Sequence, residues 1–167
     1  NFVRVLDFRP MNDIPENWKN QVEYIQGDIR NVESIKLAVN GMDSVFHLAA
    51  IPSIAKERND TYQDINVKGT RNVLKIAKDF GVKKALYISS STVYGIPQKI
   101  PLTENDDLNP IGYYGKSKIE AEIIAQELSD SDFIVNIVRP RVILGGGRIG
   151  IFGILFNRIL KNKRIYF

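Results

Sequence analysis

Lys84-Ala85-Leu86-Tyr87-Ile88-Ser89-Ser90-Ser91-Thr92 is an apolar segment that runs into four hydroxyl side chains. Its apolar part predicts a strand over residues 84–89. Apolar residues at helical spacing predict one helix before it, over residues 61–80, and one after it, over residues 114–128. Because parallel strands need a helical crossover between them, this order indicates a parallel sheet.

The same alternation runs through the rest of the chain. Two further helices are expected, over residues 32–40 and 151–160, and the polar stretch over 9–20 is expected to be a loop. Further strands are predicted over residues 2–8, 22–26, 43–50 and 133–138. The fold class is therefore α/β, a Rossmann-like, doubly wound parallel sheet.

Residues suited to ligand chemistry lie where the predicted strands end. In such sheets ligands bind outside the carboxyl ends of the strands. The residues are Asp7, Asp28, Leu48-Ala49-Ala50, Ser89-Ser90 and Pro140. Asp7 is suited to accept hydrogen bonds from an adenosine ribose and repels a 2′-phosphate, so NAD is expected. Arg9, two residues later, is suited to a phosphate and keeps NADP as the less favoured alternative.

Tyr114-Gly115-Lys116-Ser117-Lys118 opens the helix predicted over residues 114–128. Residues four apart lie on one helix face, so Tyr114 and Lys118 are expected to share one site. A nearby ammonium favours the phenolate and lowers the pKa of the tyrosine, which makes the pair an acid/base unit for a hydroxyl proton. The hydroxyls after the strand predicted over 84–89 are expected to hold a substrate oxygen nearby, the alternative being turn chemistry.

Composition argues against several classes of protein. The net charge of +4 is spread along the chain, so no nucleic-acid partner is expected. With no cysteine and one histidine, no metal site is expected, and His47 is assigned a structural role. No apolar run reaches the roughly 18 residues of a membrane span, and the lack of cysteine fits a reducing, cytoplasmic location.

Six motifs in this order resemble the extended short-chain dehydrogenase/reductase superfamily, in particular the NAD-dependent sugar epimerase/dehydratase family with members such as UDP-glucose 4-epimerase. The resemblance covers nearly the whole chain. Its carriers are Gly27-Asp28-Ile29-Arg30, Val45 to Ala50, Asn66 to Leu74, Ser89 to Gly95, Tyr114 to Lys118 with Glu120 to Glu122 after it, and Arg139-Pro140.

The resemblance implies a role for each matching residue. Tyr114 is expected to be the catalytic base, Lys118 to lower its pKa and bind the nicotinamide ribose, and Ser90 to hold the substrate hydroxyl. Cofactor contacts are expected at Asp7, Asp28, Ile29, Leu48, Ala49, Ala50, Asn66, Ser89, Tyr114, Lys118 and Pro140. Substrate contacts are expected at Ser90, Ser91, Thr92 and Val142.

The resemblance also implies an activity and a partner. The expected activity is epimerisation or dehydration of a nucleotide sugar through transient oxidation of a hydroxyl. A homodimer is expected through the helix that carries Tyr114, because Ile119, Ile123 and Ile124 leave apolar surface on more than one side of it.

A Gly-rich phosphate turn is expected some 20 residues before the ribose acid of a dinucleotide site, and nothing of the kind precedes Asp7. Residues 1–140 are therefore expected to form an NAD(P)-binding domain that lacks its first β-α unit. Residues 141–167 are expected to begin a substrate-binding region whose remainder is missing, and a fragment of this kind is expected to be poorly active.

Two other functions remain open. One is an NAD(P)-dependent dehydrogenase or reductase of a non-sugar alcohol, of the hydroxysteroid dehydrogenase kind, because Val142 stands where nucleotide-sugar members often carry Asn. The other is a non-catalytic module that senses a dinucleotide. A sensor has no need of Tyr114, Lys118 and Ser90 together, which makes it the least favoured of the three.

Overall fold

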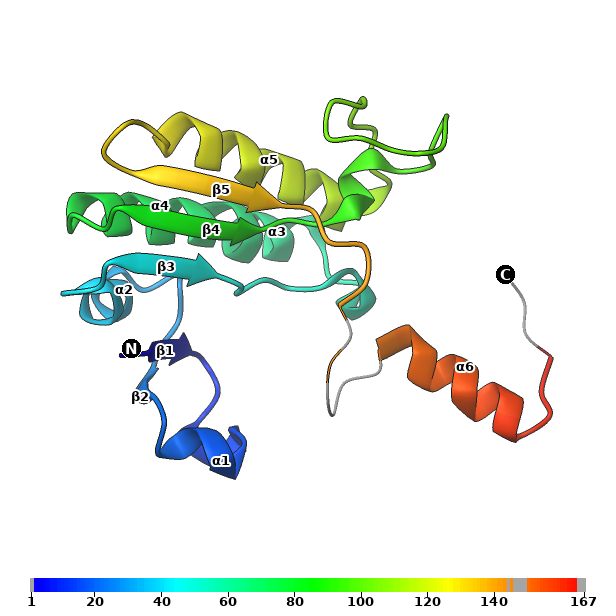
Figure 1. Cartoon of the computed structure of the whole chain (residues 1–167), viewed down its shortest axis with the longest axis horizontal. Coiled ribbons are helices and arrows are strands. Elements are labelled where there is room, and N and C mark those ends of the chain that lie inside the picture. The colour runs from blue at the N-terminus through cyan, green and yellow to red at the C-terminus, as the bar shows by residue number, and fades with distance from the viewer. Residues whose placement is uncertain (1, 144, 146–149, 165–167) are drawn as a thin grey trace.

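The computed structural model describes residues 2–143, 145 and 150–164, and within them five parallel strands form two hydrogen-bonded groups (Figure 1). In the first group β1 (Arg4–Asp7) pairs with β2 (Glu23–Gln26). In the second, β4 (Lys84–Ile88) lies between β3 (Ser44–His47) and β5 (Ile134–Val138). The parallel arrangement that the sequence predicts is therefore confirmed.

The break between the two groups lies between β1 and β3, which share no ladder. A doubly wound sheet of order 3-2-1-4-5-6 has its first strand at this position. The described strands in the order β2-β1 and β3-β4-β5 correspond to 3-2 and 4-5-6 of that scheme. The single sheet that the sequence predicts therefore appears as two groups in the described residues.

Helices cover one face of the β3-β4-β5 group (Figure 1). The described helices of eight residues or more are α2 (Val32–Val39), α4 (Gly69–Asp79), α5 (Gly112–Leu128) and α6 (Gly150–Leu160). Buried side chains of β4, α4 and α5 form one core, with Tyr87, Leu74 and Ala121 at most 1% exposed. On the opposite face Phe46 of β3 is 68% exposed, so alternate strand residues point to covered and uncovered sides.

The helix predicted over residues 61–80 is the largest departure from a regular element. It is continuous but consists of α3 (Asn59–Tyr62), a π-helical segment (Gln63–Lys68) and α4. The extra residue of a π-helical turn shifts the face on which later residues lie, and such turns are common at functional sites. Sequence periodicity does not reveal this local change of pitch.

Two further boundaries differ from the sequence prediction. β3 ends at His47 rather than Ala50, because its last ladder partner on β4 is Tyr87. The predicted loop over residues 9–20 contains a 3-10 turn (Met11–Asp13) and α1 (Glu16–Lys19), each preceded by a proline. Proline fixes a backbone angle that suits the start of a helical turn.

In the described part of the chain, every helix is too short or too polar to cross a membrane.

Candidate functional site

The start of α5 is brought close to the turn that follows β4. A Cβ placed on Gly115 would lie 2.7 Å from the Cβ of Pro110 and 3.1 Å from the carbonyl oxygen of Thr92. Only a residue without a side chain fits at that distance, so Gly115 lets the helix pack directly on the turn. This packing brings Tyr114 next to the hydroxyl residues at the end of β4.

The sequence leaves two roles open for Ser90, which are holding a substrate oxygen and stabilising a turn. Its side chain caps a 3-10 turn (Ser91–Tyr94), accepting hydrogen bonds from the Thr92 amide at 3.2 Å and from Thr92 Oγ1 at 3.0 Å. The Ser90 hydroxyl also lies close enough to Tyr114 to act to lower the pKa of that phenol. Ser90 is 9% exposed, so the turn holds its hydroxyl in a fixed place beside the tyrosine.

Lys118 is buried one turn along from Tyr114, at 3% exposure. Its Nζ donates to the carbonyl oxygen of Ile88 at 2.8 Å and lies 4.7 Å from the centre of the Tyr87 ring. Burial lowers the pKa of Lys118 to about 8, while the Glu122 carboxylate acts to raise it. The lysine is thus held at the end of β4 by a backbone carbonyl.

The expected effect of Lys118 on Tyr114 is not found. Burial raises the pKa of Tyr114, and the nearby Ser90 hydroxyl opposes this only in part. The Lys118 ammonium is bound to the Ile88 carbonyl instead. That Lys118 lowers the pKa of Tyr114 therefore stays a prediction, because periodicity places two residues on one face without fixing where their side-chain ends go.

Asn66 lies in the π-helical segment and is 1% exposed. Its amide donates to Ser117 Oγ at 3.0 Å and to the Ile51 carbonyl at 3.2 Å, and it accepts from the Ile51 amide at 2.8 Å. The side chain therefore ties the segment after β3 to α5. Through this tie Asn66 supports the exposed residues Leu48 and Ala49 at the edge of the sheet.

Asp7 is the last residue of β1 and Asp28 lies two residues after the end of β2, and each is held by an arginine two residues later. Arg9 Nη2 lies 2.8 Å from Asp7 Oδ2, and Arg30 Nη2 lies 2.6 Å from Asp28 Oδ2. Hydrogen bonds from these arginines hold the pKa of both carboxyls below the usual range. Both carboxylates therefore stay charged, which a ribose or adenine contact requires.

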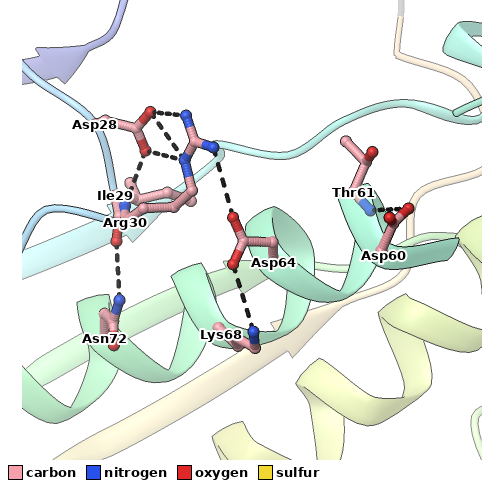
Figure 2. A network of polar contacts seen from close by, with 8 residues as sticks. All are labelled: Asp28, Ile29, Arg30, Asp60, Thr61, Asp64, Lys68 and Asn72. Carbon is pink, nitrogen blue, oxygen red and sulfur yellow. Dashed lines mark hydrogen bonds and ion pairs between the residues drawn. The ribbon is translucent and has the colours of Figure 1, made fainter. Parts of the chain in front are cut away.

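Figure 2 shows how the Asp28 end of the site is joined to the helix behind it. Arg30 also reaches Asp64 Oδ2 at 3.5 Å, and Lys68 lies at the same distance from Asp64 Oδ1. The carbonyl oxygen of Ile29 accepts from Asn72 Nδ2 at 3.2 Å. An open depression next to Asp28 is lined by Arg30, Asn31 and Val32.

Three other residues predicted to contact cofactor or substrate differ in how exposed they are. Ser89 is 3% exposed. Two buried side-chain atoms have no hydrogen-bond partner among the described residues, namely Ser89 Oγ and Tyr87 Oη. Pro140 is half-buried and its carbonyl accepts from the Ser91 amide at 3.0 Å. Val142 is 48% exposed on the segment that leaves β5.

His47 is buried and belongs to the core rather than the site. Its Nε2 lies 2.9 Å from Thr70 Oγ1, which itself donates to the Asn66 carbonyl at 2.6 Å. The histidine therefore carries its proton on Nε2. Burial lowers the pKa of His47 to about 3, so the ring stays neutral, in agreement with the structural role assigned from the sequence.

Sequence reasoning did not predict the buried ion pair between Glu122 and Arg139. Their atoms Oε2 and Nη2 lie 2.7 Å apart, with the side chains 3% and 17% exposed. Glu122 is spaced four residues after Lys118, the same interval that separates Lys118 from Tyr114. That repeated spacing was the available signal, because it places all three residues on one face of α5.

The residues at the carboxyl edge fit NAD on chemical grounds. One charged carboxylate ends β1 and another lies two residues after β2. Exposed Leu48 follows β3, and β4 is followed by the Ser89 hydroxyl, which has no hydrogen-bond partner among the described residues. A dinucleotide needs acceptors for ribose and adenine donors, apolar surface along its length and polar groups near the reacting ring. The described residues supply these three kinds of group at one edge.

The fold is a parallel, Rossmann-like sheet with a tyrosine, a lysine and a serine at the end of its central strand. This combination defines the class of short-chain dehydrogenase/reductase proteins. The chain belongs to the NAD dependent epimerase/dehydratase family, whose profile matches residues 4–165.

Similar proteins agree with this family. An Escherichia coli O157:H7 protein, N-acetyl-alpha-D-glucosaminyl-diphospho-ditrans,octacis-undecaprenol 4-epimerase, is 38% identical over 82% of this chain and 42% of its own length. A short-chain dehydrogenase/reductase superfamily protein from Agrobacterium tumefaciens, solved with bound NAD, is 30% identical, with a TM-score of 0.71 over 82% of this chain and 40% of its own.

A third similar structure is MoeE5 in complex with UDP-glucuronic acid and NAD. It is 26% identical, with a TM-score of 0.81 over 94% of this chain and 52% of its own. The chain therefore spans about two fifths to one half of the length of these relatives.

Proposed function

We propose that the protein to which this chain belongs is an NAD-dependent epimerase or dehydratase of a nucleotide sugar. The observation that carries the proposal is the placement of the Ser90 hydroxyl, held by the turn after β4, next to Tyr114 and near the buried Lys118. A hydroxyl substrate placed there meets a proton acceptor and a hydroxyl that fixes its orientation. The UDP-glucuronic acid and NAD bound to MoeE5 support the choice of substrate class and cofactor.

Tyr114 removes the proton of a sugar hydroxyl, and Ser90 holds that hydroxyl in place. NAD, when bound, would accept the hydride that leaves the carbinol carbon as the hydroxyl becomes a ketone, and would place a positive charge near the phenol. Because burial raises the pKa of Tyr114, the tyrosine relies on such a charge and on the nearby Ser90 hydroxyl to act as a base. Buried Lys118 keeps water out and adds a positive charge at the end of β4.

The cofactor is held along the carboxyl edge. Asp7 binds the adenine ribose, and Asp28 with Ile29 flanks the adenine. Leu48, Ala49 and Ala50 lie along the dinucleotide, supported from behind by Asn66. Ser89, Lys118 and Pro140 lie at the nicotinamide end. Ser91, Thr92 and Val142 lie on the substrate side.

A dehydrogenase of a non-sugar secondary alcohol is the second candidate. Val142 favours it, because an exposed apolar side chain two residues after Arg139-Pro140 offers no hydrogen bond to a sugar or a nucleotide. The dehydrogenase differs from the first candidate in its products, since it releases NADH for every alcohol oxidised.

The test uses the full-length protein with NAD and a panel of UDP-, dTDP- and GDP-sugars, to which a polyprenyl-diphosphate N-acetylglucosamine is added. Absorbance at 340 nm and product identity are followed together. A new epimer or 4-keto sugar without net NADH supports the proposal and identifies the substrate. NADH released from a steroid or another secondary alcohol, with no sugar product, replaces it with the dehydrogenase.

A further inference from the structure

A buried ion pair joins the helix of Tyr114 to the segment that leaves β5. Arg139 donates from Nε to Glu122 Oε1 at 3.0 Å and from Nη2 to Glu122 Oε2 at 2.7 Å. Two parallel bonds between a guanidinium and a carboxylate fix both the distance and the relative orientation of the groups. A lysine in place of the arginine has no such planar fork.

The third nitrogen of Arg139 reaches the opposite side, toward the turn after β4. Nη1 donates to Tyr94 Oη at 2.7 Å and to the carbonyl oxygen of Glu104 at 3.1 Å. Tyr94 is the last residue of the 3-10 turn that Ser90 caps, and it is 8% exposed. One side chain therefore contacts α5, the turn and the loop beyond it.

The backbone beside Arg139 holds the other end of the same turn. The Pro140 carbonyl accepts from the Ser91 amide at 3.0 Å, and the Val138 carbonyl accepts from the Ser89 amide at 2.8 Å. The turn is thus fixed at Ser91 by backbone and at Tyr94 by the Arg139 side chain. Arg139 in turn is bound to α5 by its ion pair with Glu122, which is the one ion pair between Arg139 and α5 among the described residues.

We propose that Arg139 is a positioning residue that sets the Ser90–Tyr94 turn against the Tyr114–Lys118 face of α5, by binding Glu122 on one side and Tyr94 on the other. The proposal rests on the proposed function, because the turn carries the Ser90 hydroxyl that orients the substrate. Among the described residues Arg139 hydrogen-bonds Glu122 and Tyr94 but neither Tyr114 nor Ser90, so it acts through its two partners.

A positioning residue is needed because Ser90 lies at the turn after β4 and Tyr114 lies on α5. No local sequence pattern fixes the distance between these two elements. A carboxylate as buried as that of Glu122 is costly unless it is paired, so the ion pair forms wherever the elements pack. The guanidinium of Arg139 binds Glu122 of α5 with one edge and Tyr94 of the turn with another nitrogen. The position of the turn therefore depends on the position of α5. A misplacement of about 1 Å between reacting groups is enough to cost about 100-fold in rate.

The test compares two variants of the full-length protein with the parent. Tyr94→Phe removes the hydroxyl that accepts from Arg139 and leaves the Glu122 pair in place. Arg139→Lys keeps a positive charge for Glu122 and loses the fork. Tyr113→Phe, the same chemical change on a 53% exposed residue of α5, is the matched control. Amide hydrogen exchange is followed by mass spectrometry, together with kcat, KM and the Kd for NAD.

In Tyr94→Phe the amides of Ser91, Val93 and Gly95 are expected to exchange about 10- to 100-fold faster, the size expected for one lost hydrogen bond to a charged group. Amides of β4 keep their protection. The kcat with the sugar is expected to fall about 10-fold while the Kd for NAD stays within about twofold. Arg139→Lys is expected to show a larger change in the same direction, and Tyr113→Phe none.

Unchanged exchange in the turn overturns the proposal, and so does faster exchange with unchanged kcat, because the pair is then structural only. A parent protein that turns over no sugar refutes the proposed function. The exchange measurement still decides whether Arg139 holds the turn, because it needs no substrate. If Arg139→Lys fails to fold, Tyr94→Phe alone gives the result.

Discussion

Gly115→Ala tests whether the close approach of α5 to the turn is what assembles the site. The new Cβ would lie 2.7 Å from Pro110 Cβ and 3.1 Å from the Thr92 carbonyl oxygen. Carbon atoms in contact prefer about 3.5–4.0 Å, so helix and loop must separate by about 1 Å. Tyr114 precedes the substituted residue and moves with it, away from Ser90.

The expected changes in stability and in rate differ in size. Overpacking costs about 1–3 kcal/mol, and the helix preference of alanine over glycine returns about 1 kcal/mol. The free energy of unfolding is therefore expected to fall by about 0–2 kcal/mol. A displacement of about 1 Å at a reacting group lowers kcat by about 100-fold. The protein should remain folded and lose most of its turnover.

The assay measures kcat with the substrate found in the sugar panel, the Kd for NAD, and unfolding in urea. Lys116→Ala is the matched control, because Lys116 is the next residue of α5 and is exposed. Its kcat should stay within about twofold of the parent. A Gly115→Ala protein with parental kcat refutes the reasoning, since it shows that the separation of helix and turn does not control the reaction.

Four further results are expected. Tyr114→Phe should bind NAD as the parent does and lose turnover, because it has no hydroxyl proton to exchange; parental turnover contradicts the proton-transfer role. Binding of NAD should be tighter than that of NADP, since Asp7 stays charged beside Arg9; Arg9→Ala should widen the difference, and tighter binding of NADP to the parent rejects the assignment. The unfolded state binds a proton at His47 below its ordinary pKa of about 6.5, whereas the folded state stays neutral down to about 3. Stability should therefore fall by about 2 kcal/mol between pH 7 and pH 5 in urea titrations, and much less in His47→Gln; an equal fall in both argues against a neutral buried ring. A homodimer should form through the exposed face of α5, where Ile123 is 48% exposed, and Ile123→Asp should yield a monomer; a monomeric parent in light scattering refutes this.

Within α5, part of the expected dimer surface belongs to the core. Ile124 is 3% exposed and Ile119 is half-buried, which leaves Ile123 as the exposed isoleucine of the three. Sequence periodicity identified three apolar positions on this helix without telling which of them the sheet covers. Burial is a property of the neighbours, and α5 packs against α4, the π-helical segment and β5.

The strand ends were predictable because they depend on local pattern. Apolar runs over residues 84–89 and 133–138 end one residue or less from the observed ends of β4 and β5. Runs of β-branched and aromatic residues favour strands whatever they pack against. The carboxyl edge of a parallel sheet then follows from topology, and it gathers Asp7, Asp28 and Ser90 without any knowledge of contacts.

Side-chain partners were not predictable in this way. The sequence places Lys118 one turn from Tyr114, yet its ammonium binds the carbonyl oxygen of Ile88, thirty positions away in the chain. Arg9 covers the Asp7 carboxylate, and Asn66 binds Ser117 across 51 residues. Contacts of this kind depend on how elements pack, and many side-chain positions satisfy the same periodic pattern.

The sequence by itself determined the parallel α/β class, the edge at which the ligand chemistry gathers, and the helix that carries Tyr114 and Lys118. These follow from the periods of strand and helix and from the handedness of the crossovers. Only the tertiary structure decided which carboxylates are paired, that burial raises the pKa of Tyr114, and that Arg139 joins Glu122 to Tyr94. Charge, burial and distance are properties of packed neighbours, and packing brings together residues that no local pattern relates.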